Sequence, residues 1–433
     1  MGGSRPISLA TADAVVTEEM ILIRCPARWI PTVMSMNSIQ ELDAIDAEKI
    51  MESFRQGTVP TQYLELYSVG RERWLASVYR DLDFIARGGS KVRFLSAPYG
   101  GGKTHFLMLV KARALSANVL VSYVELHSRE APFDRFEVIF PKVMRGVTLP
   151  DGHGVEHMLE DWARQFPYYS SQEIEANLRQ VAPSLDFRAA LRACLQYANT
   201  DSPDHRMRMQ AIVAWLQGYR VSSELKATGI RSNVTIANVS EILGSFLQFV
   251  RASGYAGLVL LLDEAEAITS LAQSRKRDEA NQNIRKLLDN ADQHSSLYVL
   301  FATTPRFLTD SDNGAQSYPA LWTRIKDVIG GELQQASSRS TVVVLPPFDQ
   351  GALEELAFRI VNTHSRAYEW NASDYCGEAA IRKYASVFLQ RGNPRMVRAF
   401  IRALVYVLDV MEERRETSAL EDILDTLEFE TEE

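Results

Sequence analysis

The 433-residue sequence has little cysteine and no long apolar segment, and these absences exclude several classes of protein. Its three cysteines, Cys25, Cys194 and Cys376, are far apart, so they predict neither a disulfide framework nor a metal site with cysteine ligands. No apolar run approaches the roughly 20 residues needed to cross a bilayer. The first 20 residues also lack the basic flank and apolar stretch of a secretion signal. We therefore expect a cytoplasmic protein with no membrane partner.

Excess charge is also absent from most of the chain. Residues 412–433 carry ten acidic and two basic side chains, which accounts for the whole net charge of −8. The remainder is neutral, with 45 residues of each sign (55 − 10 and 47 − 2), and it has no broad basic stripe that would indicate nucleic-acid binding. The one compact basic cluster, residues 275–277 (Arg-Lys-Arg), is expected on a loop. There it is either solvated or in contact with DNA phosphates.

A glycine-rich loop is the first feature that carries chemistry. Residues 92–96 (VRFLS) predict a strand, residues 97–104 (APYGGGKT) follow, and the next eleven residues have the apolar spacing of a helix. Strand, glycine loop and helix form the context of a P-loop, in which backbone N–H groups and a helix N-terminus surround phosphates. Lys103 is expected to reach the β- and γ-phosphates, and the Thr104 hydroxyl to hold magnesium. Ala97 replaces the usual first glycine, which is tolerable if its φ is negative.

Two carboxylates follow a second apolar run. Residues 257–262 (GLVLLL) predict a strand that is buried on both faces, as in a parallel sheet. Asp263 and Glu264 come directly after it, at the end of the strand where such sheets bind ligands. Asp263 is expected in the magnesium shell, and Glu264 is expected to orient and polarise the attacking water. A solvated acidic turn is the alternative, and the P-loop upstream favours the site.

Three further polar positions follow along the chain. Residues 297–302 (LYVLFA) predict a strand that ends at Thr303, with Thr304 next. Arg324 comes 21 residues after Thr303, and residues 341–345 predict another strand. Beyond Pro346 the sequence is helical, and Arg395 lies in the first turn of a helix that Asn393 and Pro394 can begin. A polar strand end, an exposed helix arginine and an arginine beside a cap are the plain alternatives.

This order of motifs resembles the initiator-type AAA+ ATPases, which include Orc/Cdc6-like proteins and STAND ATPases. Residues 56–60 (QGTVP), 67–72 (YSVGRE) and 98–106 (PYGGGKTHF) resemble, more narrowly, the BrxD-like ATP-binding proteins of bacterial BREX phage-defence systems. The resemblance covers about residues 45–410. It implies ATP and Mg²⁺ as cofactors, ATP hydrolysis, and a location in the bacterial cytoplasm. It also implies a homo-oligomer that meets other defence proteins, with double-stranded DNA as a further candidate partner.

The resemblance also implies roles for individual residues. Thr303 would be sensor 1, with Thr304 as the alternative, and Arg324 would reach the nucleotide of a neighbouring subunit. Arg395 would be sensor 2, with Arg398 as the substitute. Glu264, Thr303, Arg324 and Arg395 are thus the catalytic candidates, and Thr104 and Asp263 the magnesium ligands. The expected ATP contacts are Val69, Gly70, Arg71, Pro98, Tyr99, Gly100, Gly101, Gly102, Lys103, Thr104 and His105. Residues 69–71 could equally form a loop before a helix, and His105 could simply pack near the sheet.

The implied fold is α/β, namely a P-loop AAA+ core with a parallel five-stranded sheet flanked by helices, a large helical insertion and a C-terminal helical lid. The second strand is expected at residues 118–125, and the 160 positions between Lys103 and Asp263 leave room for the insertion. The expected divisions are an N-terminal extension (1–44), the first part of the core (45–147), the insertion (148–250), the second part of the core (251–347), the lid (348–411) and an acidic tail (412–433).

Two functions remain open from the sequence. The first is an oligomeric ATPase in a defence complex, with DNA as a candidate substrate. The second is an ATP-dependent switch or scaffold that oligomerises and recruits partner proteins with little turnover. The acidic tail and the large insertion favour the second. Rapid hydrolysis and stimulation by DNA would favour the first.

Overall fold

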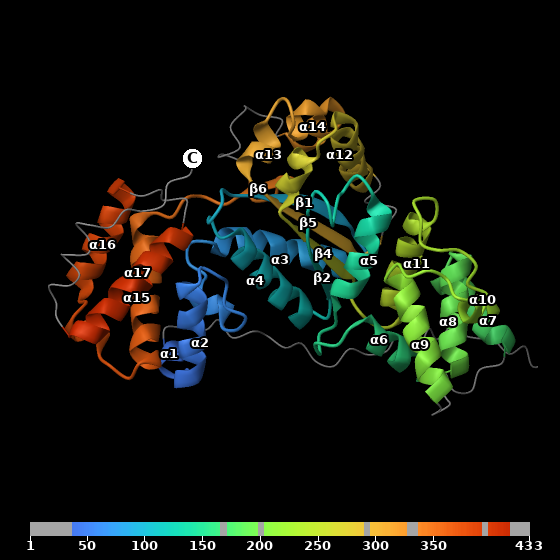
Figure 1. Ribbon diagram of the computed structural model, residues 1–433, viewed down its shortest axis with the longest axis horizontal. Coiled ribbons are helices and arrows are strands. Elements are labelled where there is room, and N and C mark those ends of the chain that lie inside the picture. The colour runs from blue at the N-terminus through green and yellow to red at the C-terminus, as the bar shows by residue number, and fades with distance from the viewer. Residues whose placement is uncertain are drawn as a thin grey trace, which may run out of the picture.

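The computed structural model describes residues 37–164, 171–197, 203–289, 295–326, 337–391 and 397–415. A central sheet lies between two groups of helices, one built from both ends of the described chain and one from its middle (Figure 1). No helix within these ranges combines the length and the apolar character needed to cross a bilayer.

The sheet has six strands in the order β3-β2-β4-β5-β1-β6. Every neighbouring pair is parallel except β2 and β3, which are antiparallel. The expectation of five parallel strands therefore missed the two-residue β3 at the edge, which is too short to give a pattern in the sequence. The strands are β1 (Lys91–Ser96), β2 (Leu120–Glu125), β3 (Val147–Thr148), β4 (Leu258–Asp263), β5 (Leu297–Thr303) and β6 (Val342–Val344).

Helices cover both faces of this sheet. Helices α3 (Glu72–Ala86) and α4 (Lys103–Ser116) pack on one face, where Leu95, Leu261 and Ala302 point. The opposite face, with Phe94, Leu262 and Phe301, has its own core. That second core includes residues of α5 (Phe136–Gly146), η2 (Ala265–Ser270), α12 (Ser274–Asp289), α13 (Pro305–Thr309) and α14 (Pro319–Ile325). Burial on both faces explains the unbroken apolar runs of β4 and β5.

Between β3 and β4 the secondary structure of the described chain is helical. Its buried side chains, among them Trp162, Phe187 and Trp215, extend the core of the second sheet face rather than forming a separate one. The insertion therefore packs continuously with the sheet through α11 and α5. Its helices are α6 (Val155–Arg164), α7 (Ser171–Val181), α8 (Leu185–Tyr197), α9 (Pro203–Leu216), α10 (Ser223–Ala227) and α11 (Val239–Ala252).

A third core joins the two ends of the described chain (Figure 1). Helix α2 packs against α15 and α17, and Arg55 on α2 donates hydrogen bonds of 3.0 and 2.9 Å to Asp409 on α17. The linear division places residues 45–69 with the ATPase core, whereas their buried side chains lie in this helical core. The elements are α1 (Asn37–Gln40), α2 (Ala44–Arg55), η1 (Leu64–Tyr67), α15 (Gln350–Ala367), η6 (Ala372–Asp374), α16 (Glu378–Arg391) and α17 (Val397–Arg414).

Two local expectations need correction. The second strand begins at Leu120 instead of residue 118, because Asn118 has φ +58° and ends α4 with a left-handed turn. The basic residues 275–277 lie in the first turns of α12 and not on a loop. There Arg275 pairs with Glu279 at 2.9 Å, and Arg277 donates to the Leu271 carbonyl at 2.7 Å. Two of the three charges are thus engaged within the chain.

Candidate functional site

A pocket opens where the P-loop at the end of β1, the end of β4 and the start of α4 meet the helical core. This is the carboxyl edge of the parallel strands, where sheets of this kind bind ligands. One part of its wall is polar and consists of the P-loop and the carboxylates after β4. The other part is apolar, and of its residues only Val69 was expected from the sequence. It comprises Phe54, Val59, Pro60, Tyr67, Val69, Phe348, Leu356, Val397 and Ile401.

The P-loop backbone alternates in a way that only glycine adopts without strain. Gly100 has φ +68° and Gly102 has φ +89°, and Gly102 directly precedes α4. Between them, the Gly101 N–H donates to the Pro98 carbonyl at 3.1 Å. Ala97 is not among the described residues with positive φ, and its methyl group is buried in the core beneath α4. The condition for an alanine at this position is therefore met.

Lys103 is almost completely buried at the floor of the pocket, with 8% of its surface exposed. Its Nζ donates to the Ala97 carbonyl at 3.1 Å and to the Pro98 carbonyl at 3.4 Å. A second neighbour is Glu266, whose Oε1 lies 3.7 Å from Nζ. Both carboxylate oxygens of Glu266 are buried without a hydrogen-bond partner. Sequence reasoning assigned no role to Glu266.

Thr104 and Asp263, the two predicted magnesium ligands, are in direct contact. The Thr104 hydroxyl donates to Asp263 Oδ2 at 3.0 Å, across 159 positions of sequence. Tyr123 on β2 was not predicted, and its hydroxyl lies 3.0 Å from the same Oδ2 and 3.1 Å from Glu125 Oε1. Burial and these two carboxylates raise the pKa of Tyr123 far above its usual value, so the phenol stays protonated and acts as a donor. One helix, α4, and one neighbouring strand, β2, thus orient Asp263 at the end of β4.

Glu264 stands at the meeting point of the pocket and two adjoining hollows. Its φ of +55° is unusual for a residue with a side chain, and such conformations cluster at functional sites. The Glu264 N–H donates to Asp263 Oδ1 at 2.9 Å. Burial and then the negative charges of Asp263 and Glu266 raise the pKa of the Glu264 carboxyl. The carboxylate is therefore a stronger base than an exposed glutamate.

The predicted segment 69–71 lies partly on the pocket wall. Val69 and Arg71 line the pocket, whereas Gly70 is not among its lining residues. Arg71 is buried, donates to the Pro346 carbonyl at 2.6 Å and lies 4.2 Å above the Phe348 ring. Burial lowers the pKa of its guanidinium to about 10. This arginine ties the segment before α3 to the segment after β6, beside the apolar wall.

His105 also lines the pocket, and its Nε2 lies 3.0 Å from the Leu64 carbonyl. Burial lowers the pKa of His105 to about 4, so the imidazole is neutral at neutral pH. Its Nε2–H must then donate to Leu64, because a carbonyl oxygen can only accept. The histidine therefore joins α4 to η1.

The two threonines at the end of β5, Thr303 and Thr304, are placed differently. Thr303 is fully buried, and its hydroxyl has no hydrogen-bond partner. Thr304 lines the larger hollow together with Glu264 and Glu266. The structure thus brings the side chain of Thr304, the alternative sensor 1, to the wall that Glu264 shares.

The three arginines also differ in position. Arg324, at the end of α14, pairs with Asp289 on α12 and does not line the pocket. Arg395 lies outside the described residues. Arg398 lines the pocket, and its backbone N–H donates to the Gly100 carbonyl at 3.2 Å. The start of α17 therefore touches the P-loop directly.

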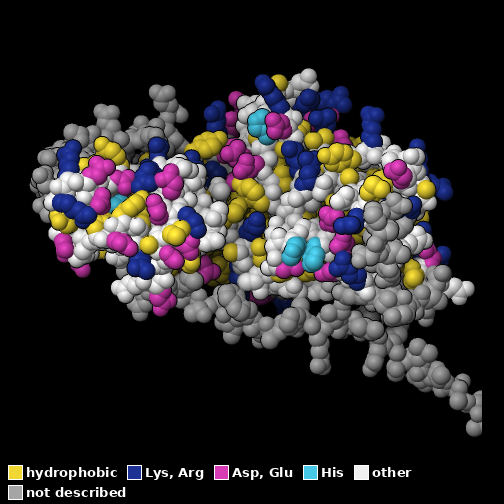
Figure 2. All heavy atoms as spheres, turned by 60° about the horizontal axis from the view of Figure 1, so that its bottom comes forward, with side chains coloured by type: hydrophobic (Ala, Val, Ile, Leu, Met, Phe, Trp, Pro, Cys, Tyr) yellow, Lys and Arg dark blue, Asp and Glu magenta, His cyan; other side chains and the backbone are white. Residues whose placement is uncertain are grey.

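Charged side chains of both signs lie on the face drawn in Figure 2. Acidic and basic side chains are intermingled there, over the C-terminal helices as well as over the middle of the molecule. Phosphate backbones are bound mainly by clustered positive charge.

The model of the BREX system ATP-binding protein BrxC/D family matches residues 43–426. A search of curated proteins gives no significant match. Among solved structures, a Walker-type ATPase of Pyrococcus abyssi is similar at 12% sequence identity and a TM-score of 0.33. That alignment covers 82% of this chain and 76% of the other. A likeness at this TM-score carries no weight in the argument.

Proposed function

The chain belongs to the family of BREX system ATP-binding proteins BrxC/D, and on this premise we propose that it hydrolyses the ATP it binds. The observation that carries the proposal is the convergence of four side chains from distant segments. Lys103 and Thr104 begin α4, Asp263 ends β4 and Glu264 follows it, yet all four line one pocket. We further infer that the sheet and its helices form an AAA+ core with α15–α17 as its lid.

The polar end of the pocket fits a magnesium–triphosphate group. Two hard oxygen donors, the Thr104 hydroxyl and the Asp263 carboxylate, already lie 3.0 Å apart beside the buried Lys103 ammonium. Mg²⁺ prefers such oxygen ligands, and when bound it neutralises charge that develops on the phosphate oxygens. Lys103 needs only to exchange its bonds to two backbone carbonyls for bonds to phosphate. The N–H groups of the glycine loop and of the first turn of α4 complete the phosphate cradle.

Glu264 is the group we assign to the attacking water. Its carboxylate accepts the proton of that water while the oxygen attacks the γ-phosphorus, and ADP leaves. The raised pKa of Glu264 brings its basicity closer to neutral pH, where a general base is most effective. The hydroxyl of Tyr123 keeps Asp263 oriented, so that the two adjacent carboxylates have separate tasks.

The apolar end of the pocket is suited to the adenine ring. Phe54, Tyr67 and Phe348 provide flat apolar surface on the side where the helical core meets the P-loop. Because α17 contacts Gly100, the position of the helical core depends on the conformation of the phosphate loop. We propose that ATP binding is transmitted to these helices, with Arg398 or Arg395 as the phosphate sensor and Thr304 or Thr303 as the sensor near Glu264.

Arg324 supports an oligomer. It lies away from the pocket of its own chain, and Asp289 holds its guanidinium near the surface with 38% of the side chain exposed. An arginine that reaches a neighbour's γ-phosphate must be exposed in this way, and its planar guanidinium suits the charge on the transferring phosphoryl group. We therefore propose a homo-oligomer in which Arg324 acts on the adjacent nucleotide.

We infer two downstream roles that differ in turnover. An ATPase motor that acts on DNA within the defence complex requires rapid hydrolysis that DNA stimulates. A switch that recruits other defence proteins requires only slow hydrolysis.

The test is to measure ATPase rate and oligomeric mass on the same samples, with and without double-stranded DNA. Wild type should hydrolyse ATP and assemble in its presence, and Lys103→Ala should lose both because the phosphate loop loses its buried cation. Wild-type hydrolysis by Lys103→Ala would refute the assignment of this pocket. Stimulation by DNA would select the motor over the switch.

A further inference from the structure

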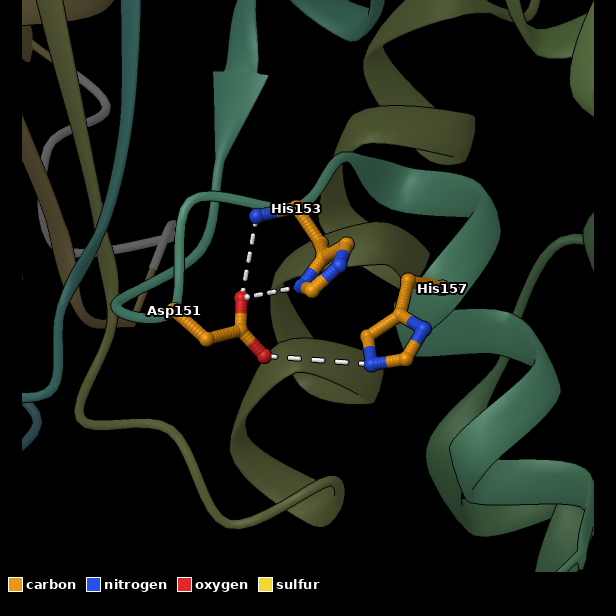
Figure 3. A group of neighbouring side chains, drawn as sticks. All are labelled: Asp151, His153 and His157. Carbon is orange, nitrogen blue, oxygen red and sulfur yellow. Dashed lines mark hydrogen bonds and ion pairs between the residues drawn. The ribbon is translucent and has the colours of Figure 1, made fainter.

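A cluster of metal-ligating side chains lies far from the P-loop, on the turn that joins β3 to α6. At this turn the chain leaves the edge of the sheet and enters the helical insertion. Asp151 and His153 lie on the turn, and His157 lies in the first half of α6. Figure 3 shows both imidazole rings beside the carboxylate of Asp151.

The distances between the ligand atoms suit a single small cation. Asp151 Oδ1 lies 3.2 Å from His153 Nδ1, and Asp151 Oδ2 lies 3.8 Å from His157 Nε2. The three ligand atoms are all within 4.8 Å of one another. In a tetrahedral site with metal–ligand bonds of about 2.0–2.1 Å, neighbouring ligand atoms are separated by about 3.3 Å. The cluster therefore needs only small adjustments to surround an ion.

The backbone holds this arrangement in place before any ion binds. The Leu149 N–H donates to the His153 carbonyl at 2.8 Å, and the Gly152 N–H donates to the Leu149 carbonyl at 2.9 Å. Leu149 is fully buried and anchors the turn in the core. The His153 N–H also donates to Asp151 Oδ1 at 3.0 Å. Two of the three ligands are thus positioned by a short, well-bonded turn.

The third ligand distinguishes the cluster from an ordinary turn. A single aspartate that accepts from the residue two positions on is common in turns, and so is a histidine paired with a carboxylate one helical turn away. His157 does form such a pair, at 3.0 Å from Asp161 Oδ2. Its Nε2 also faces the second oxygen of Asp151, and its ring stacks on His153 with centroids 4.2 Å apart. Two imidazoles therefore converge on one carboxylate.

We propose that Asp151, His153 and His157 bind one divalent transition-metal ion of the Zn²⁺ class. Two imidazole nitrogens and a carboxylate oxygen form a ligand set that binds Zn²⁺, Co²⁺ and Ni²⁺ more tightly than it binds Mg²⁺. Asp161 is close enough to His157 to supply a fourth ligand. The ion clamps the start of α6 to the turn after β3, and so fixes the insertion at the edge of the sheet.

The experiment uses the full chain without a histidine tag, first stripped of metal by a chelator. Zn²⁺ is titrated against a chromogenic chelator in excess Mg²⁺ and without nucleotide, so that the carboxylates near the P-loop do not contribute. Co²⁺ binding is followed separately by its visible absorption, which reports imidazole and oxygen ligands. Wild type should bind one equivalent of either ion.

Three variants locate the site. The double variant His153→Ala/His157→Ala and the single variant Asp151→Asn should lose this equivalent. The matched control His127→Ala, which removes an exposed histidine outside the cluster, should keep it. In hydrogen exchange, Zn²⁺ should slow exchange in residues 147–164 of wild type but not of the double variant. Absence of one-equivalent binding in wild type, or its persistence in the double variant, would overturn the proposal.

Discussion

The replacement Glu264→Gln tests the hydrolysis chemistry most directly. Glutamine keeps the size and shape of the side chain but removes the basic oxygen that would accept the proton of the attacking water. The structure places this carboxylate between Asp263 and Glu266, which raise its pKa together with burial. The substitution therefore removes a base whose strength these surroundings increase.

Glu264→Gln should greatly lower the rate of ATP hydrolysis and should not weaken ATP binding. A positioned general base contributes about 10²–10⁴-fold to rate, which corresponds to about 2.7–5.5 kcal/mol in activation free energy. ATP affinity should be equal or higher in the variant. The reason is that glutamine removes one of three negative charges, those of Asp263, Glu264 and Glu266, that line the pocket proposed to hold the triphosphate.

The assay separates the two effects. Single-turnover phosphate release measures the chemical step, and a fluorescent ATP analogue measures binding to the same samples. Because the pKa of Glu264 is raised, the ATPase rate of wild type should begin to fall at a higher pH, as the pH is lowered, than it would if the base were an exposed glutamate. The residual rate of the variant should not show this fall.

The control is Glu241→Gln, an exposed glutamate on α11 that is remote from the pocket. It should match wild type in both assays. A Glu264→Gln protein that released phosphate at the wild-type rate would refute the assignment of Glu264 as the base. Loss of ATP binding in the same variant would show instead that the carboxylate holds the nucleotide site together.

Three further predictions follow from individual contacts. A mixture of Arg324→Ala protein and Glu264→Gln protein should recover part of the ATPase activity. The reason is that some subunit interfaces then combine an intact Arg324 with an intact Glu264. Mixed oligomers that are confirmed by mass but show no recovery would exclude the action of Arg324 on the neighbouring subunit. Tyr123→Phe should lower turnover by about tenfold or less while ATP binding persists. The reason is that Asp263 loses one of its two side-chain hydrogen-bond donors, at a cost of about 1 kcal/mol. Unchanged turnover would mean that Tyr123 has no part in orienting Asp263. In denaturant titrations at a series of pH values, the free energy of unfolding should decrease less toward acid pH in His105→Gln than in wild type. The pKa of His105 is about 4 in the folded protein, below its usual value of 6.5. The contribution of this histidine to the free energy of unfolding is therefore fully present above pH 6.5 and decreases by about 3 kcal/mol toward pH 4. The same pH dependence in wild type and variant would contradict this effect of burial.

Much of the local structure follows from sequence patterns alone. The strand–loop–helix context of the P-loop is confirmed in β1 and α4, and the apolar run that ends in Asp263 is confirmed as β4. These patterns are reliable because they depend on neighbouring residues. An apolar run of about six residues between turns is typical of a strand buried on both faces, and glycine-rich stretches indicate turns that need positive φ.

Other parts of the candidate site depend on contacts between distant segments. Tyr123 and Asp263 are 140 positions apart, and they meet only because β2 and β4 are neighbours in the sheet. The apolar wall likewise requires α2 to pack on α15 and α17, which brings both ends of the described chain to one pocket.

The phosphate-binding loop, the acidic strand end and the family of the chain can thus be predicted from its residues alone. The side chains that surround these motifs are known only from the folded chain. It put Thr304 on the wall near Glu264, paired Arg324 with Asp289, and brought Glu266 within 3.7 Å of Lys103. The physical reason is that backbone conformation is set by local sequence, whereas side-chain neighbours are set by strand order and helix packing, which no short pattern encodes.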